Sequence, residues 1–195
     1  MRSSVSLRFA LVFLLVVATT GTLMAQALTA PPGGGNQRAV VTQYMGLVSV
    51  TIDYNAPDVT SPQGQDRTGQ IWGQLVPWGI APNPFFPQFG TAETMPWRAG
   101  SNQATKITFS HDVEIEGTAV PAGTYALFMA PGEEEWTVIL NKNSDAWGSF
   151  FYDPDLDVAQ VKVKPEKTDF FREWLTFEFD DRQLDTTQAV LHWEH

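Results

Sequence analysis

Apolar and polar residues alternate along most of the chain after Ala39. In the segment 47–54, Val48, Val50 and Ile52 fall on one face, and polar residues separate them. This period-two alternation of β-branched residues is typical of a half-buried strand. The pattern predicts roughly nine strands, over residues 40–44, 47–54, 104–110, 113–116, 125–130, 136–140, 158–164, 173–180 and 187–193.

The segment 125–130 is apolar on both faces and therefore predicts a central strand. Residues 136–140 follow it after a turn and predict its hairpin partner. Leu175, Phe177 and Phe179 alternate with other residues and are expected to face the core. No segment shows the period of a long helix. The predicted fold class is all-β, an antiparallel β-sandwich or open barrel of roughly nine strands with long aromatic loops and little helix.

Two loop regions interrupt the strand pattern. Residues 69–76 fit either one helical turn or a short strand, because their glycines disfavour a longer helix. Residues 77–96 contain five prolines, which exclude a central strand, together with Phe85, Phe86 and Phe89. A loop of this length is uncommon and tends to be functional or mobile.

Residues 1–27 have the pattern of a secretory signal peptide. Arg2 and Arg8 supply positive charge, an apolar run covers residues 9–18, and small residues precede the predicted cleavage after Ala27. The run has about ten residues, whereas a membrane span needs roughly 20, which disfavours an uncleaved anchor. We therefore expect a periplasmic or secreted protein with no membrane span after cleavage. The chain has no cysteine, so it is not a lipoprotein.

The rest of the chain is predicted to form a flexible Pro/Gly leader over 28–38 and a single β-rich domain over 39–195. The full chain carries a net charge of −10, and removal of the signal peptide takes away two arginines and no acid. Nucleic acids and anionic lipids bind basic surfaces, so neither is an expected partner. Solubility is the simplest explanation of the acidity.

The segment 95–109 holds the densest group of bulky, charged and turn-forming residues. Its Trp97-Arg98 pair leads into a Gly/Ser/Asn turn and then into a strand. Arg98 could hold a carboxylate or phosphate against an apolar wall of Trp72 and Trp97. Alternatively, Arg98 pairs within the fold and locks the loop to the sheet, which is the commoner use of such residues. The candidate ligand-binding residues are Arg67, Trp72, Trp97, Arg98, Asn102, Thr105 and His192.

Signatures of catalysis and of cofactors are missing from the sequence. There is no cysteine, no Gly-x-Ser-x-Gly motif and no phosphate-binding loop. The three histidines, His111, His192 and His195, lack the convergent spacing of a metal site. We therefore predict no catalytic residue, no metal and no cofactor, although acidic pairs that converge only in space stay open.

Several motifs resemble those of one bacterial exported family, "domain of unknown function 2911", in order and over nearly all of residues 40–194. They are Tyr54-Asn-Ala-Pro57, Gln70-Ile-Trp-Gly73, Leu75-Val-Pro77, Trp97-Arg-Ala-Gly-Ser-Asn-Gln-Ala-Thr105, Val120-Pro-Ala-Gly-Thr-Tyr125, Trp136-Thr-Val-Ile-Leu-Asn-Lys142, Trp147-Gly148 and His192-Trp-Glu194. The resemblance implies an exported β-rich domain without an assigned activity. The chain departs from the family pattern by an apparent insertion over 81–95 and by Gln103, where the family tends to have an acid.

These observations predict an exported, non-enzymatic module that binds a small molecule, a glycan or an envelope protein at the Trp/Arg motif and the aromatic loop. Two alternatives stay open. One is a hydrolase of envelope or extracellular material, in which Arg98, Asn102 and His192 would converge. The other is a structural envelope protein whose motifs only serve packing.

Overall fold

The computed structural model describes residues 35–195 of the chain. The predicted signal peptide and most of the predicted leader lie outside the described residues. Within the described part, no helix is long and apolar enough to cross a membrane.

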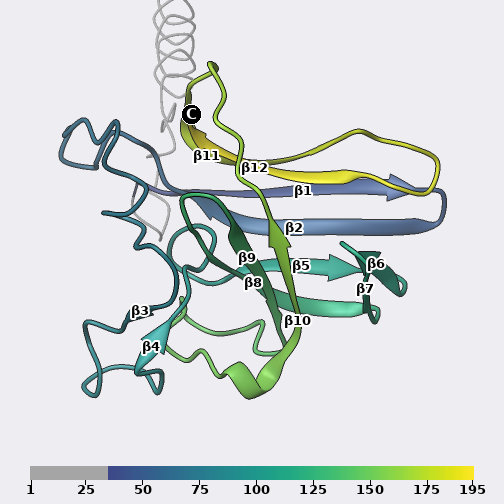
Figure 1. Cartoon of the computed structure of the whole chain (residues 1–195), viewed down its shortest axis with the longest axis horizontal. Coiled ribbons are helices and arrows are strands. Elements are labelled where there is room, and N and C mark those ends of the chain that lie inside the picture. The colour runs from purple at the N-terminus through teal and green to yellow at the C-terminus, as the bar shows by residue number, and fades with distance from the viewer. Residues whose placement is uncertain (1–34) are drawn as a thin grey trace, which may run out of the picture. The chain divides into compact units, whose positions relative to one another are not determined.

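One large antiparallel sheet forms the centre of the fold, with strand order β1-β2-β5-β8-β9-β10 (Figure 1). The all-β prediction is confirmed, and the sheet does not close into a barrel. The strands of this sheet are β1 (Gln37–Met45), β2 (Val48–Ala56), β5 (Thr105–Phe109), β8 (Gly123–Ala130), β9 (Trp136–Asn141) and β10 (Asp157–Val163).

The other elements form three two-stranded sheets and one 3-10 helix. All the strands that the alternation predicts are present, and β3, β4 and β7 are additional strands too short to produce a visible alternation. These elements are β3 (Ala81–Pro82) with β4 (Thr94–Met95), β6 (Val113–Ile115) with β7 (Thr118–Val120), β11 (Arg172–Asp180) with β12 (Gln188–Glu194), and η1 (Pro154–Leu156).

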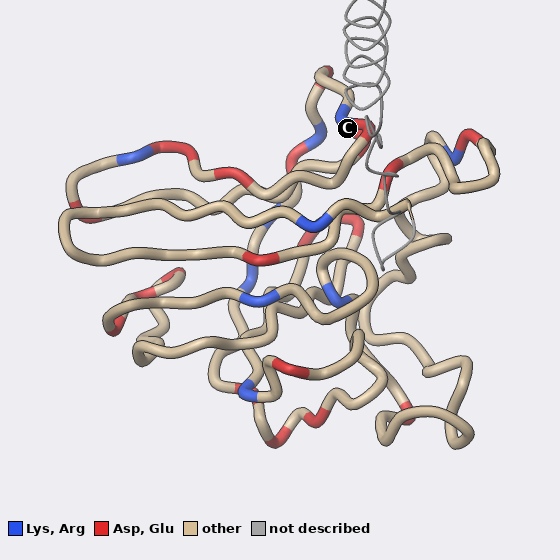
Figure 2. The backbone as a smooth tube through the Cα atoms, turned by 180° about the vertical axis from the view of Figure 1, so that it is seen from behind, with Lys and Arg blue, Asp and Glu red and all other residues tan. Residues whose placement is uncertain are grey.

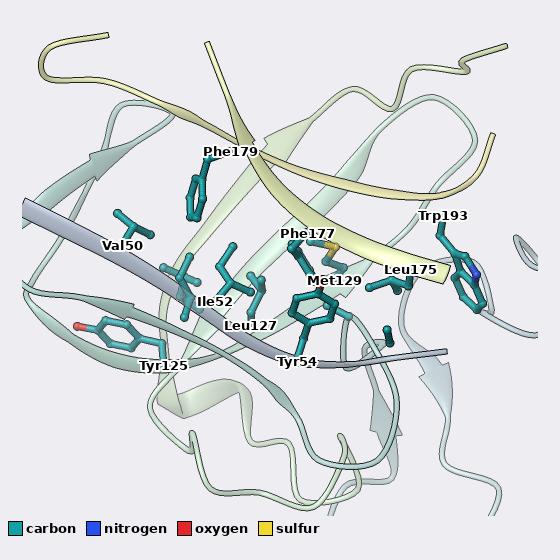
Figure 3. Close-up of a cluster of buried hydrophobic side chains, with 14 of the residues drawn as sticks. Val50, Ile52, Tyr54, Tyr125, Leu127, Met129, Leu175, Phe177, Phe179 and Trp193 are labelled. Carbon is teal, nitrogen blue, oxygen red and sulfur yellow. The ribbon is translucent and has the colours of Figure 1, made fainter. Parts of the chain in front are cut away.

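The first hydrophobic core lies between the large sheet and the β11–β12 hairpin. Ile52 and Tyr54 of β2 point toward Phe177 and Phe179 of β11 (Figure 3). The Tyr54 and Phe177 rings meet edge to face with centroids 5.0 Å apart. Leu175, Phe177 and Phe179 are buried, which confirms the predicted inward face of this strand. Burial of each such side chain contributes about 1.5–3 kcal/mol.

Strand β8 separates this first core from a second one. Tyr125 and Leu127 face the first core, whereas Ala126 and Phe128 face the second. The second core also contains Tyr152 and is covered by loops instead of by another sheet. The prediction of a central strand that is apolar on both faces is therefore confirmed.

The structure differs from the sequence prediction at the start of the domain and in residues 69–76. Strand β1 begins at Gln37, two residues inside the predicted leader. Arg38 belongs to the strand because its guanidinium binds the carboxylate of Asp53 on β2. Residues 69–76 form hydrogen-bonded turns and an isolated bridge between Trp72 and Val76, so they are neither a helix nor a regular strand.

Candidate functional site

The Trp97-Arg98 pair lies where a loop leaves the large sheet. Trp97 and Met129 exchange both backbone hydrogen bonds, each 2.8 Å long. Pairing with β8 resumes at Thr105, which lies opposite Leu127. Residues 98–104 therefore form an excursion between two nearby positions on the same strand. This excursion is called the motif loop below.

The motif loop is closed by its own hydrogen bonds. The Thr105 amide donates to the Arg98 carbonyl at 3.2 Å, and the Thr105 hydroxyl donates to the Ala99 carbonyl at 2.9 Å. Arg98 Nη1 donates to the Asn102 carbonyl at 3.1 Å. Ala99 and Asn102 have φ values of 52° and 59°, a left-handed conformation that costs an alanine about 1 kcal/mol. A loop with these bonds is fixed in one shape.

The tip of the motif loop rests on the end of β2. The Ser101 amide donates to the Asn55 carbonyl at 3.0 Å. Asn55 Nδ2 donates to Gln103 Oε1 at 3.2 Å. The Gln103 amide oxygen accepts this hydrogen bond as a carboxylate would. This position therefore serves a contact between the loop and the sheet.

Arg98 is a largely buried cation that lies over an aromatic ring. Its guanidinium carbon is 5.1 Å from the centroid of Phe150. Burial lowers the pKa of Arg98 below its ordinary value, yet a guanidinium stays charged. Within residues 35–195 no carboxylate lies within ion-pair distance of it. Gly148, at φ 62°, makes room for the Arg98 guanidinium. A Cβ at this position would lie only 2.9 Å from Arg98 Nη1.

Four tryptophans from separate parts of the chain form a cluster next to the motif loop. Trp72 lies at the centre, with ring centroids 5.7 Å from Trp97, 4.8 Å from Trp136 and 5.9 Å from Trp193. Trp97 and Trp193 are stacked, with centroids 6.3 Å apart. The two candidate residues Trp72 and Trp97 are thus brought together, mainly to pack against other tryptophans.

The C-terminal strand holds this tryptophan cluster in place. The buried carboxylate of Glu194 accepts a hydrogen bond from the Gly69 amide, at the start of the turn that carries Trp72. The Trp193 indole N–H is buried and has no hydrogen-bond partner among the described residues. The cluster is therefore more a packing unit than a polar binding site.

Arg67 and His192 make their hydrogen bonds to segments other than the motif loop. Arg67 donates to the carbonyls of Val59 and Asp58 at 3.0 Å and 2.8 Å, and so closes the loop after β2. His192 Nε2 donates to the Phe170 carbonyl at 3.0 Å and lies 3.2 Å from the Thr168 hydroxyl. Arg98 and His192 thus have separate hydrogen-bond partners.

The Phe-rich loop, residues 83–92, displays its aromatic side chains to solvent. Phe85, Phe86 and Phe89 are 55%, 41% and 44% exposed. Asn83 is buried and donates from its amide to the carbonyls of Phe89 and Ala92 at 3.2 Å and 2.9 Å. These bonds fix the base of the loop, so the rings are held outward although their exposure is unfavourable.

Phe150 joins the Phe-rich loop to the Trp/Arg motif. Its ring centroid lies 5.7 Å from Phe85 and 5.2 Å from Phe89, and Arg98 lies over the same ring. The backbone carbonyl of Phe150 also accepts hydrogen bonds from the amides of Thr91 and Ala92. Two regions that are separate in sequence thus share one buried support.

An open depression of about 320 Å³ lies beside the Phe-rich loop, lined by residues 91–94 and 152–154. The Tyr152 hydroxyl at its wall donates to Asp157 at 2.8 Å. Burial, and then this bond to a carboxylate, raise the pKa of Tyr152. A tyrosine with a raised pKa stays protonated and is a poor base. Within the described residues, no three His, Asp or Glu side chains are placed to hold a metal ion.

The comparisons with known proteins identify the family. A family model described as "Protein of unknown function (DUF2911)" matches residues 36–195. The chain belongs to this family. The resemblance of the Trp-Arg motif and its companions is therefore confirmed, and the shared description assigns no activity. Searches of curated proteins and of solved structures returned no match.

The sequence did not indicate the role of Phe150 or Asn83, which are placed by contacts with distant segments, and it indicated Gly148 only as part of a motif. The Trp147-Gly148 motif was the one sequence signal that pointed to this region. Phe150 itself could not be distinguished from Phe151 by pattern, because both lie in a loop without periodicity.

Proposed function

We propose that this protein is an exported, non-enzymatic binding module whose binding surface is the Phe-rich loop, with the Trp/Arg motif as its support. The observation that carries the proposal is the shared ring of Phe150, which contacts Phe85, Phe89 and Arg98. The motif loop thereby stiffens a displayed set of aromatic side chains. In this proposal the motif loop positions the phenylalanines, and the ligand binds to the phenylalanines.

The expected ligand is a segment of protein with exposed apolar side chains. Phenylalanines that stay exposed on a fixed loop are typical of protein interaction sites, because a soluble protein gains nothing from their hydration. A fixed loop also loses little conformational entropy on binding. The neighbouring depression offers a place for one side chain of such a partner.

The test uses a random peptide display library, selected with the protein and then with the triple variant F85S/F86S/F89S. We expect the protein to enrich peptides with aromatic or aliphatic residues, and the variant to bind them at least about tenfold more weakly, because three apolar contacts are lost. The matched control is L47S/L184S, since both leucines are 90% exposed on other elements. Equal binding by the triple variant and the control would refute the assigned surface.

A further inference from the structure

The outer face of the large sheet, opposite the first core, carries a row of four threonines. The strand registers place Thr42 opposite Thr51, Thr51 opposite Thr108, and Thr108 opposite Thr124. The row therefore crosses β1, β2, β5 and β8. Its length is about 14 Å, because neighbouring strands are roughly 4.8 Å apart.

The threonines form two hydrogen-bonded pairs. The hydroxyls of Thr42 and Thr51 are 2.9 Å apart, and so are those of Thr108 and Thr124. Each pair uses one hydroxyl hydrogen, so one donor and several lone pairs per pair are left for other partners. The two outer residues, Thr42 and Thr124, are exposed. The row thus presents ordered donors and acceptors to solvent.

An aromatic ring and further hydroxyls border the threonine row on its hairpin side. Tyr44 follows Thr42 on the same face of β1 and is 67% exposed. Ser49 lies opposite Tyr44 in the strand register. The Ser110 hydroxyl accepts a hydrogen bond from the Ser49 amide at 2.7 Å. The face therefore combines one apolar ring with a field of hydroxyl groups.

The charged residues that β1, β2 and β5 carry are all in ion pairs. Arg38 binds Asp53 through two hydrogen bonds, and Lys106 binds Asp145 at 2.6 Å. Beyond Asp53 and Lys106, toward the hairpin ends, β1, β2 and β5 carry no charged residue, as the tan tubes in Figure 2 show. Asp112, just past the end of β5, accepts a hydrogen bond from the Ala122 amide, so the nearest further charge is an acid that would repel an anionic ligand.

We propose that this hydroxyl-rich face binds a neutral, extended polysaccharide chain. Sugar rings offer hydroxyls that exchange hydrogen bonds with threonines, and an apolar ring face that stacks on tyrosine. An extended chain repeats these groups at a regular spacing, which a straight row across four strands can match. The paired charges favour a neutral glycan over an anionic one. This inference is independent of the Phe-rich loop.

The test is native affinity electrophoresis of protein secreted by a host that expresses the full chain. The gels contain hydroxyethyl cellulose, xylan, galactomannan or laminarin, with alginate as the anionic comparison. We expect retardation by at least one of the four neutral polysaccharides. The variant T42V/T124V keeps the side-chain shape and removes two outward hydroxyls, so retardation should weaken about tenfold. Y44A should weaken it similarly, whereas Y44F should not.

The control variant T118V/T186V removes two hydroxyls from other elements and should leave retardation unchanged. The melting temperature of each valine variant should stay within a few degrees of the original, since the substituted groups are at the surface. Absence of retardation in all four neutral gels would overturn the proposal. Retardation by alginate alone, or equal retardation of T42V/T124V, would do the same. If the original protein eluted as a dimer in size-exclusion chromatography and T42V/T124V as a monomer, the face would be assigned to self-association and the proposal would be overturned.

Discussion

Arg98 contacts both its own loop and the ring of Phe150. A buried cation without a neighbouring carboxylate is unusual, because desolvation of the charge is not offset by an ion pair. The long apolar stem of arginine contributes packing in addition to its charged head. The two contributions can be separated by substitution.

We expect R98A to lower the free energy of unfolding by about 2–4 kcal/mol, since it removes packing, a hydrogen bond and the cation–π contact. R98M keeps the stem and relieves the desolvation, so its loss should be about half as large. Urea unfolding followed by tryptophan fluorescence measures both. If R98A matched the original protein within about 0.5 kcal/mol, the supporting role of Arg98 would be excluded.

Tyr152 makes stability depend on pH in the alkaline range. Its folded pKa is raised above the unfolded value of about 10, so its stabilising contribution is complete below pH 10 and is lost as the pH rises further. In Y152F the alkaline loss should be smaller, while stability at neutral pH falls by about 1–2 kcal/mol with the bond to Asp157. Urea unfolding at a series of pH values between about 8 and 11 gives both quantities.

The control for this measurement is Y44F, because Tyr44 is exposed on the outer face of β1. Its pH profile should follow that of the original protein. A Y152F profile with the original alkaline slope would show that Tyr152 does not cause the loss.

Among the elements, the motif loop depends on one buried hydroxyl. Thr105 is fully buried and its hydroxyl satisfies the Ala99 carbonyl. T105V should cost about 1–2 kcal/mol, since that carbonyl would stay buried without a donor. T105S keeps the donor and should cost less. Trypsin cleavage after Arg98 should be faster in T105V than in T105S, and equal rates would contradict closure of the loop by this hydroxyl.

The strands could be predicted from sequence because alternation is a local signal. Segments such as 47–54 and 173–180 show by themselves which face is buried, and the structure buries that face. The predicted hairpin of 125–130 with 136–140 is confirmed as β8–β9, whereas the pairing of strands that are not consecutive carried no such local signal. Nothing local in Trp97 indicates that it bridges to Met129, or that the loop after it returns to the same strand.

The candidate site was only partly accessible to sequence reasoning for the same reason. Two neighbouring groups contain five of the candidates. The tryptophan cluster includes Trp72 and Trp97, and the hydrogen bonds of the motif loop involve Arg98, Asn102 and Thr105. The seven candidate ligand-binding residues would form one site only if all of these motifs lined the same pocket. Side-chain direction depends on tertiary contacts, and these direct Arg67 and His192 toward other loops.

For the whole molecule, we propose export by a signal peptide that is cleaved after Ala27. We expect the exported protein to begin at Leu28, because Ala25 and Ala27 are the small residues that signal peptidase requires. N-terminal sequencing of protein recovered outside the cytoplasm measures this directly. A25R/A27R should block processing and retain the longer chain. A sequence that starts at Met1 in exported protein would contradict cleavage.

The position of β8 between two cores has a consequence for how the protein opens. Because the strand contributes side chains to both cores, it can leave the sheet only when both cores open. Its backbone amides should therefore exchange with deuterium only through complete unfolding, whereas those of the Phe-rich loop exchange through local fluctuations. Hydrogen exchange measured by mass spectrometry should find the slowest amides between Tyr125 and Met129. Their protection should fall in step with the global stability of every variant that weakens either core.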